Sequence, residues 1–421
     1  MTKKTKELVG RRTILKGAAA TAASATIGFP HISLAQNKPI KVGMVTIQSG
    51  RGAMVGNASS KGASMVIEAF NKAGGLKGRP IELIVRDSKG KPDESTRIVR
   101  EFINSDGCEI IFDADSSAAA FAVQEAVRQL GVLTIHMNSE TSSLTADPKI
   151  RSWNAFRVAR QGIHDAIAGG SYAAEVSKQK GLKKWMGCSP DYAYGRDSNK
   201  LFFEYLQHFN KDVTIIGESW PKLFQADYTE QLTKILQAKP QAIYSCLWGG
   251  DLTAFVDQSS IYNLFAQMQV FAINIADYSI LTAIKNLPKG IHSGSRYLST
   301  FPKTKENSDW SAAYQAKFKE FPVNWSWENY VGAQMVTEAI TKTQSVDSKK
   351  LSEAIAGMTI KSPFGADGTV TMRAEDHTLI NYATGWGQTI QKSPYVPDVK
   401  AVDWKVILEL EKEWKKKQGY I

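Results

Sequence analysis

The stretch EIIFDADSSAAAFAVQEAVRQLG, Glu109 to Gly131, joins a short apolar run to a longer segment whose alanines and valines recur at helical spacing. The run Ile110 to Phe112 predicts a buried β-strand, and Ala118 to Leu130 predicts an amphipathic helix. Ser116 and Ser117 stand where that helix begins, and the first backbone NH groups of a helix lack intrahelical partners. This helix end is therefore either capped by its own serine or available to an anionic or polar group of a ligand.

The same alternation of strand and helix continues on both sides of this stretch. Apolar runs and helical segments alternate from residue 40 to residue 136, and the pattern restarts with a helix at residue 164. Helices are expected at residues 59–73, 92–104, 118–130, 164–179, 196–209, 228–238, 251–262, 310–320, 330–343 and 349–358, and β-like segments at residues 369–373 and 378–386. Strands that alternate with amphipathic helices form parallel βαβ units. We therefore expect an α/β protein with two Rossmann-like lobes, each built on a parallel central sheet.

The first 35 residues have the order of an export signal peptide, which is basic, then apolar, then rich in small residues. Arg11-Arg12 precede the Ala-rich run, and Ser33-Leu34-Ala35 provides a small-residue cleavage pattern. The arginine pair and the following Leu15-Lys16 resemble the twin-arginine signal, from which Gly10 and Ile14 depart. An ordinary secretory signal is the alternative. Both interpretations predict an exported, periplasmic protein that loses residues 1–35.

Composition and charge narrow the class of protein. The chain has 421 residues, 43% of them hydrophobic, which suits about two globular domains. The signal carries six basic residues and one acidic residue, so the net charge of +11 falls to +6 without it. The remaining basic residues are spread along the chain, and no nucleic-acid partner is expected. Cys108, Cys188 and Cys246 match no metal-binding spacing and are expected to be buried free thiols.

The loops that follow the predicted strands are the candidates for a site, because ligands of parallel sheets bind beyond the carboxyl ends of the strands. These loops are Gln48 to Gly50, Asp113 to Ser117 and Asn138 to Thr141 in the first half, and Asp191 to Gly195, Trp248 to Asp251 and Asn274 to Tyr278 in the second. The first set offers hydroxyl and backbone NH groups, and the second offers aromatic rings and carboxylates. Aromatic residues in Gly-rich loops favour a ligand wall over a core position. Asp277 could equally cap the helix that follows it.

These motifs together resemble the leucine/isoleucine/valine-binding protein type of periplasmic solute-binding protein, a family that feeds ABC importers. The segments that carry the resemblance fall in the family's order over residues 38 to 390: Lys41-Val42-Gly43-Met44, Ser49-Gly50, NKAGGLKGRPIELIVRD, Ser116-Ser117, Asn138 to Leu144, and Tyr194-Gly195. The resemblance implies a type I periplasmic binding fold. Lobe 1 would contain residues 38–157 and 292–362, and lobe 2 residues 158–291 and 363–421. Three hinge crossings would join them, near Arg157, Ile291 to Arg296, and Pro363 to Gly368.

The resemblance also assigns roles to individual residues. Ser116, Ser139 and Thr141 match positions that hold a ligand carboxylate or amide oxygen. Tyr194 and Trp248 match aromatic residues that cover the ligand from the other lobe. The donors of the first group would then face the rings of the second across a cleft that closes by hinge motion.

Two acidic residues, Asp277 and Asp115, are also expected near the ligand. Asp277 matches an acid that would hold a ligand ammonium group. Asp115 stands directly before Ser116 and would repel a ligand anion unless it is neutralised or turned away, so it is expected to meet a positive or hydrogen-donating group. Asp115 takes the place of one of the family's disulfide cysteines, and Met54-Val55 stands where the branched-chain binders have an aromatic residue. A branched-chain amino acid ligand is therefore not implied.

The sequence as a whole predicts a monomeric binding protein that delivers a small polar ligand, an amino acid, amide or amine, to an ABC permease in the inner membrane. A binder of aromatic carboxylates is the alternative, because Trp248 and the nearby tyrosines can stack on a ring. A ligand sensor for a membrane receptor and an exported hydrolase are alternatives of other classes. No Gly-x-Ser-x-Gly, Cys-x-x-Cys or helical His pair occurs, so neither enzymatic activity nor a cofactor or metal is expected.

Overall fold

The stretch Glu109 to Gly131 folds as strand β3 (Ile110–Ala114) followed by helix α3 (Ser117–Leu130), as predicted. Gly131 ends the helix at φ 69°, a left-handed conformation that glycine adopts without strain. The computed structural model describes residues 38–421, so the predicted signal peptide at residues 1–35 lies outside the described residues. From residue 38 to residue 421, no helix has both the length and the apolar character that crossing a membrane requires.

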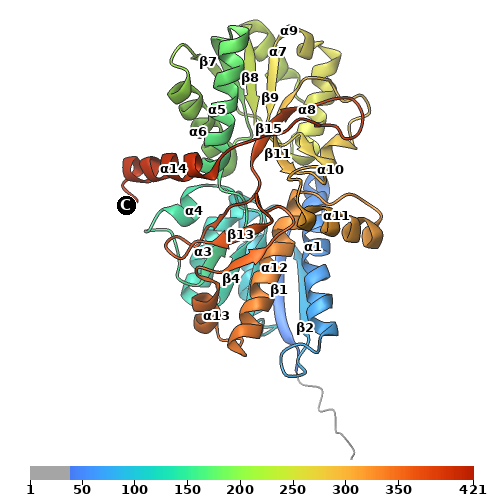
Figure 1. The fold of residues 1–421 in the computed structure, drawn as a ribbon, viewed down its shortest axis with the longest axis vertical. Helices are drawn as coiled ribbons and strands as arrows, with labels where there is room; N and C mark the ends of the chain where they lie inside the picture. The colour runs from blue at the N-terminus through green and yellow to red at the C-terminus, as the bar shows by residue number, and fades with distance from the viewer. Residues whose placement is uncertain (1–37) are drawn as a thin grey trace, which may run out of the picture. The chain divides into compact units, whose positions relative to one another are not determined.

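The first sheet has the strand order β2-β1-β3-β4-β5, with bounds Ile81–Asp87, Ile40–Thr46, Ile110–Ala114, Leu133–His136 and Ala155–Arg157 (Figure 1). All of its strand pairs are parallel. Strands β1 and β3 are buried almost throughout, as expected for a parallel sheet that helices cover on both faces. The carboxyl ends of β1, β3 and β4 therefore lead into loops at one edge of this sheet.

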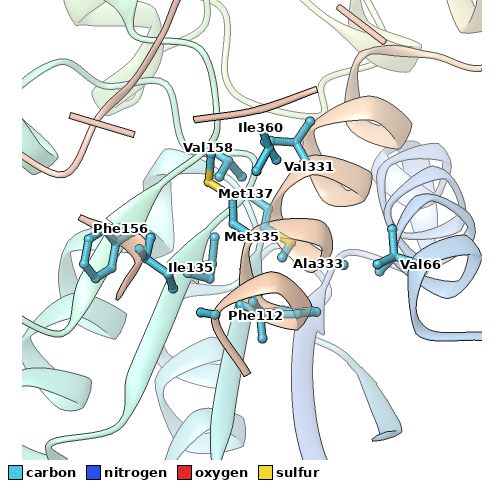
Figure 2. Packing of buried hydrophobic residues seen from close by; sticks show 14 of the residues in the cluster. Val66, Phe112, Ile135, Met137, Phe156, Val158, Val331, Ala333, Met335 and Ile360 are labelled. Atoms are coloured by element: carbon cyan, nitrogen blue, oxygen red, sulfur yellow. The ribbon is translucent and has the colours of Figure 1, made fainter. Parts of the chain in front are cut away.

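Helices from distant parts of the chain cover the first sheet. Helix α1 (Ala53–Lys72) packs along α12 (Asn324–Thr343), and α2 (Pro92–Asn104) packs along α3. Figure 2 shows Phe112 and Ile135 of the sheet in one core with Met335 of α12. Ile111, whose side chain points to the opposite face, packs with residues of α2 and α3. A helix from the C-terminal part of the chain therefore completes the first lobe.

The second sheet has the strand order β16-β15-β11-β9-β8-β6-β7, with bounds Lys400–Ala401, Gly385–Gln388, His292–Tyr297, Gln269–Ala272, Ala242–Ser245, Lys184–Cys188 and Thr214–Ser219. The pairs among β6, β7, β8, β9 and β11 are parallel, whereas β15 and β16 are antiparallel to their neighbours. The connecting helices α5, α6, α7 and α8 span Gly162–Lys180, Ala193–Phe209, Thr229–Ala238 and Gly249–Ile261. The short strand β10 (Ala276–Asp277) pairs with β11.

Strand pairing and packing assign two segments differently from the predicted lobe boundaries. Strand β11 begins the segment 292–362, predicted for lobe 1, yet it pairs with β9 and β15 of the second sheet. A small antiparallel sheet follows, with strands β12, β13 and β14 at Thr359–Lys361, Thr369–Met372 and Leu379–Ile380. Val370 and Leu379 of this sheet lie in the core of the first lobe, although residues 363–421 are predicted for lobe 2. We therefore place the second and third crossings after Tyr297 and Tyr382; such short strands take their place from long-range pairing that local patterns do not reveal.

The predicted helices agree with the observed ones to within a few residues at most ends. Helices α1 and α12 begin earlier than predicted, at residues 53 and 324 instead of 59 and 330. Helix α14 (Trp404–Gln418) is absent from the prediction; it packs on α5, and its Glu411 forms an ion pair with Arg373 at 2.6 Å. The remaining helices α4, α9, α10, α11 and α13 span Ser143–Ala146, Leu264–Gln267, Tyr278–Leu281, Lys305–Phe318 and Ser348–Ile355.

The three cysteines are free and buried, as the sequence predicts. Burial raises the pKa of the Cys108, Cys188 and Cys246 thiols to about 12. These thiols therefore stay protonated near neutral pH, which makes them unreactive.

Candidate ligand-binding site

A pocket lies where strand-end loops of the two lobes meet, with about 550 Å³ of empty space when the part open to solvent is included. The first lobe contributes Ser116, Ser117, Asn138 and Glu140 to its wall. The second contributes Tyr192, Tyr194, Trp248, Asn274, Asp277 and Arg296. Its wall combines a few polar groups with aromatic rings, as in sites that bind small molecules.

The start of α3 presents a serine hydroxyl that lacks a partner. Ser116 is the N-cap residue of this helix, but its side chain makes no capping hydrogen bond. Its Oγ is buried and has no hydrogen-bond partner among the described residues. The backbone NH of Ser116 donates to Oδ1 of Asp115 at 2.6 Å. A buried polar atom without a partner is costly, and Ser116 Oγ, at the first turn of a 14-residue helix, has the capacity to bond a polar group that enters the pocket.

Ser139 and Thr141 fix the neighbouring loop but do not belong to the wall of the pocket. The Oγ of Ser117 accepts hydrogen bonds from the backbone NH groups of Glu140 at 3.1 Å and Thr141 at 3.3 Å. The hydroxyl of Ser139 donates to the same Oγ at 3.0 Å. These bonds hold the loop after β4 against the start of α3. The structure thus brings both predicted residues next to the pocket, in a supporting position.

Asp115 is fully buried and does not line the pocket. Its Oδ2 accepts a hydrogen bond from the hydroxyl of Ser95 at 2.7 Å, and its Oδ1 accepts one from the NH of Ser116. Burial, and then the charge of Asp113, raises the pKa of Asp115 to about 6. The acid that the sequence places next to the ligand site is therefore turned toward α2, and it takes up a proton more readily than an ordinary aspartate.

Aromatic rings from both lobes form one wall of the pocket, three from the second lobe and one, Trp325 of α12, from the first. Tyr194 and Trp248, both predicted, line the pocket together with Tyr192 and Trp325. The rings of Tyr192 and Tyr194 lie 5.9 Å apart, and the ring of Trp248 meets that of Trp325 nearly edge-on at 6.0 Å. The indole NH of Trp248 donates to the hydroxyl of Tyr192 at 2.9 Å. These contacts hold the rings in position for a flat or apolar part of a ligand.

Asp277 lines the pocket, but both of its oxygens already accept hydrogen bonds. Oδ1 accepts from the NH of Ser279 at 2.9 Å and caps α10, and Oδ2 accepts from the NH of Asn324 at 2.8 Å. Burial raises the pKa of Asp277. Asp277 therefore caps a helix, which is one of the two roles that the sequence allows for it.

A buried ion pair in the pocket is absent from the sequence-based prediction. Glu140 and Arg296 line the pocket and form an ion pair, and Arg296 also binds Asp165 at 2.9 Å. Oε2 of Glu140 is buried and has no hydrogen-bond partner among the described residues. Burial raises the pKa of Glu140, against the opposing effect of Arg296. A lone arginine in the polar strand sequence HSGSRY is the signal that could have pointed to this pair.

The pocket in the described part of the chain lacks a cluster that would bind a metal. From residue 38 onward, no three His, Cys, Asp or Glu side chains lie close enough together to hold a metal ion. The acids in the wall are engaged with Arg296 and with two helix N-termini. The chemistry that the wall offers is hydrogen bonding and contact with aromatic rings.

Comparison with known proteins gives the family. A family model for periplasmic binding proteins matches residues 39–385. Leu/Ile/Val-binding protein homolog 4 of Brucella abortus is 24% identical over 380 residues, which cover 84% of this chain and 85% of the relative. A solute-binding protein of an ABC transporter from Rhodopseudomonas palustris, solved with 3,4-dihydroxybenzoic acid, has a TM-score of 0.77 at 24% identity and covers 86% of this chain and 96% of its own.

A second solved structure, an amino acid ABC transporter substrate-binding protein from Pseudomonas fluorescens, has a TM-score of 0.73 at 20% identity and covers 87% of this chain and 95% of its own. These structures share the fold described above, with its parallel sheets in two lobes. The match to the family model covers nearly all of both sheets. The chain therefore belongs to the periplasmic binding protein family, as a type I member of the leucine/isoleucine/valine-binding protein type.

Proposed function

We propose that this chain is the solute-binding component of an ABC importer and that it captures a small carboxylate between its two lobes. The importer role is supported by the family and by the solved relatives, which are ABC transporter proteins. Export through the signal at residues 1–35, a permease partner in the inner membrane and a monomeric state are parts of the same proposal.

The observation that carries the ligand class is the unpartnered hydroxyl of Ser116 at the start of α3. The N-terminus of a helix attracts negative charge, typically by about 0.3–1 kcal/mol, and the serine hydroxyl adds a donor. The hydroxyl of Ser117 stands beside it in the same wall. A carboxylate would satisfy these donors at once.

An aromatic carboxylate is the ligand that the wall supports best. Tyr194, Trp248 and Trp325 offer ring faces and edges to a flat body. Asp277, the acid expected to hold an ammonium group, already accepts hydrogen bonds through both oxygens. The relative from Rhodopseudomonas palustris, solved with 3,4-dihydroxybenzoic acid, is consistent with this class.

An amino acid is the second candidate, and a different observation favours it. Oε2 of Glu140 lacks a partner, and the backbone NH of this residue lies 3.1 Å from Ser117 Oγ. An acid so close to the start of α3 could accept a hydrogen bond from an ammonium group adjacent to a bound carboxylate. The relative from Pseudomonas fluorescens belongs to an amino acid transporter.

A thermal-shift screen of residues 36–421 tests the proposal, followed by calorimetry of every ligand that raises the melting temperature. The panel contains benzoate, 3,4-dihydroxybenzoate, leucine, glutamine and putrescine. A ligand present at a hundred times its Kd stabilises the folded protein by about 2.7 kcal/mol. Stabilisation by the aromatic acids alone supports the first ligand class, and stabilisation by the amino acids supports the second. A response to putrescine alone would contradict the carboxylate proposal.

A further inference from the structure

The hydroxyls of Tyr192 and Tyr194 lie in the aromatic wall. The hydroxyl of Tyr192 already accepts a hydrogen bond from the indole NH of Trp248, a group that can only donate. Trp248 Nε1 lies 2.9 Å from the hydroxyl oxygen of Tyr192. An indole nitrogen has a proton and no lone pair for hydrogen bonding, so Tyr192 must be the acceptor in this contact. The proton of the Tyr192 hydroxyl is therefore left for another partner.

The hydroxyl of Tyr194 likewise accepts a hydrogen bond and keeps its own proton unused. Asn274 Nδ2 lies 3.0 Å from this hydroxyl and 3.1 Å from the backbone oxygens of Cys246 and Leu247. Carbonyl oxygens only accept hydrogen bonds, so the side chain of Asn274 must direct its NH₂ group toward them. The amide orientation is thereby fixed, and Tyr194 also accepts where it meets Asn274.

Both tyrosines keep their protons near neutral pH. Burial raises the pKa of Tyr192 and of Tyr194 well above the ordinary value. Neither hydroxyl donates a hydrogen bond to another residue within the range 38–421. With rings 5.9 Å apart, the two side chains place a pair of unused donors in one part of the pocket wall.

The charges of the pocket decide which acceptor fits there. Glu140 and Asp277 line the same pocket, and the guanidinium of Arg296 is already paired with Glu140 and Asp165. A second anionic group on the ligand would meet acids and no unpaired cation, so it would lose hydration without compensation. An uncharged oxygen has no such cost and can accept a hydrogen bond from a tyrosine hydroxyl of this wall.

We propose that Tyr192 and Tyr194 form a donor subsite for an uncharged oxygen of the ligand, a carbonyl or hydroxyl oxygen, separate from the carboxylate at α3. The inference rests on the proposed function, because it assumes that the carboxylate binds at Ser116. It narrows the ligand class to carboxylates that carry a second, neutral oxygen acceptor.

Calorimetry with matched ligand pairs tests this subsite. For aromatic acids the pair is 4-formylbenzoate and 4-methylbenzoate, and for aliphatic acids it is 4-oxopentanoate and pentanoate. In each pair one ligand has a carbonyl oxygen where the other has only carbon and hydrogen. The ligand with the oxygen should bind the wild-type protein about threefold to tenfold more tightly in the series that fits the pocket, as expected for one hydrogen bond.

The variant Tyr194→Phe should lower this preference, read as the ratio of the two Kd values within the variant, because one of the two donors is lost. It is the cleaner of the two tyrosine changes, because Asn274 Nδ2 retains its two carbonyl acceptors. Tyr262→Phe, at a residue that is 39% exposed and outside the pocket wall, is the matched control and should keep the preference. Circular dichroism and thermal melts check that each variant folds.

The possible outcomes separate the subsite from the wider proposal. Binding without a preference for the oxygen, or a preference that Tyr194→Phe leaves intact, overturns the subsite while the carboxylate proposal stands. The absence of binding by all four acids and by the amino acids of the first screen overturns the carboxylate proposal, and the subsite falls with it.

Discussion

The backbone NH of Asn324 donates to Oδ2 of Asp277 at 2.8 Å, which joins the first turn of α12 in one lobe to the end of β10 in the other. The second carboxylate oxygen accepts from the NH of Ser279 at 2.9 Å. One side chain thus satisfies two helix N-termini, whose NH groups have no intrahelical partners. This arrangement makes Asp277 a structural link between the lobes in the wall of the pocket.

Replacing Asp277 by Ala should lower the free energy of unfolding by at least about 1 kcal/mol, because the cap of α10 and the acceptor for α12 are both lost. Urea denaturation followed by circular dichroism measures the loss. Asp277→Asn keeps one acceptor oxygen and should be less destabilised than the alanine variant. Unchanged stability combined with lost affinity for amino acids would instead identify Asp277 as the ammonium partner.

Replacing Trp248 by Ala should weaken ligand binding more than tenfold, or by about 1.4 kcal/mol or more, because the ring is part of the pocket wall and packs edge-on against Trp325. Isothermal titration calorimetry with the best ligand of the screen gives the affinity. Trp153→Ala is the control, since this tryptophan is 49% exposed and lies outside the pocket wall. Equal affinities for the two variants would remove Trp248 from the site.

Local signals explain what the sequence predicts correctly. The spacing of apolar residues and the residues that start a helix are both local features of the sequence. The β3–α3 junction and most helices can therefore be predicted from the sequence alone. Strand-end loops of a parallel sheet converge at one edge, which is why Ser116, Tyr194 and Trp248 all reach the pocket wall. Ser139 and Thr141 come close for the same reason and take supporting positions.

Long-range pairing explains what the sequence does not predict. Glu140 and Arg296 are 156 residues apart, and nothing near either residue indicates the other. The place of β11 in the second sheet likewise depends on partners elsewhere in the chain. The direction of a single side chain is equally hidden: Asp115 points toward Ser95 and away from the pocket, although its neighbour Ser116 lines it.

Asp115 should make stability depend on pH. Its pKa in the folded protein is about 6, against an ordinary value of 3.8. Between these values the folded state holds a proton that the unfolded chain has released, so this carboxyl makes stability fall as the pH rises through the window. Each tenfold change in a protonation equilibrium is worth about 1.4 kcal/mol, so the full effect is on the order of 3 kcal/mol.

The variant Asp115→Asn lacks this titration. Its free energy of unfolding relative to the wild-type protein should therefore rise between pH 4 and pH 6 and level off above that range, as urea denaturation at about six pH values would show. A difference that stays constant across the range would mean that Asp115 has an ordinary pKa in the folded protein.

Arg160 connects two of the chain crossings between the lobes, the one that follows β5 and the one after Tyr382. It follows β5, forms an ion pair with Asp165 and donates to the backbone oxygen of Ala383 at 3.1 Å and to the hydroxyl of Thr384 at 2.9 Å. Its own backbone NH donates to Glu328 of α12 at 3.0 Å. The side chain is buried, so each of these bonds is made away from water.

Replacing Arg160 by Met should therefore destabilise the protein by about 3–5 kcal/mol, the usual cost of breaking a buried ion pair by removing one partner. Part of that cost comes from leaving the carboxylate of Asp165 with fewer partners, so adding Asp165→Asn to the variant should cost less than the sum of the two single changes. Arg97→Met removes an arginine from an exposed pair with Glu94 and should leave the urea midpoint nearly unchanged. If Arg160→Met moved the midpoint no more than Arg97→Met, the contacts of Arg160 would not hold the lobes together, and α14 with its Glu411–Arg373 pair would be the next element to test as their connection.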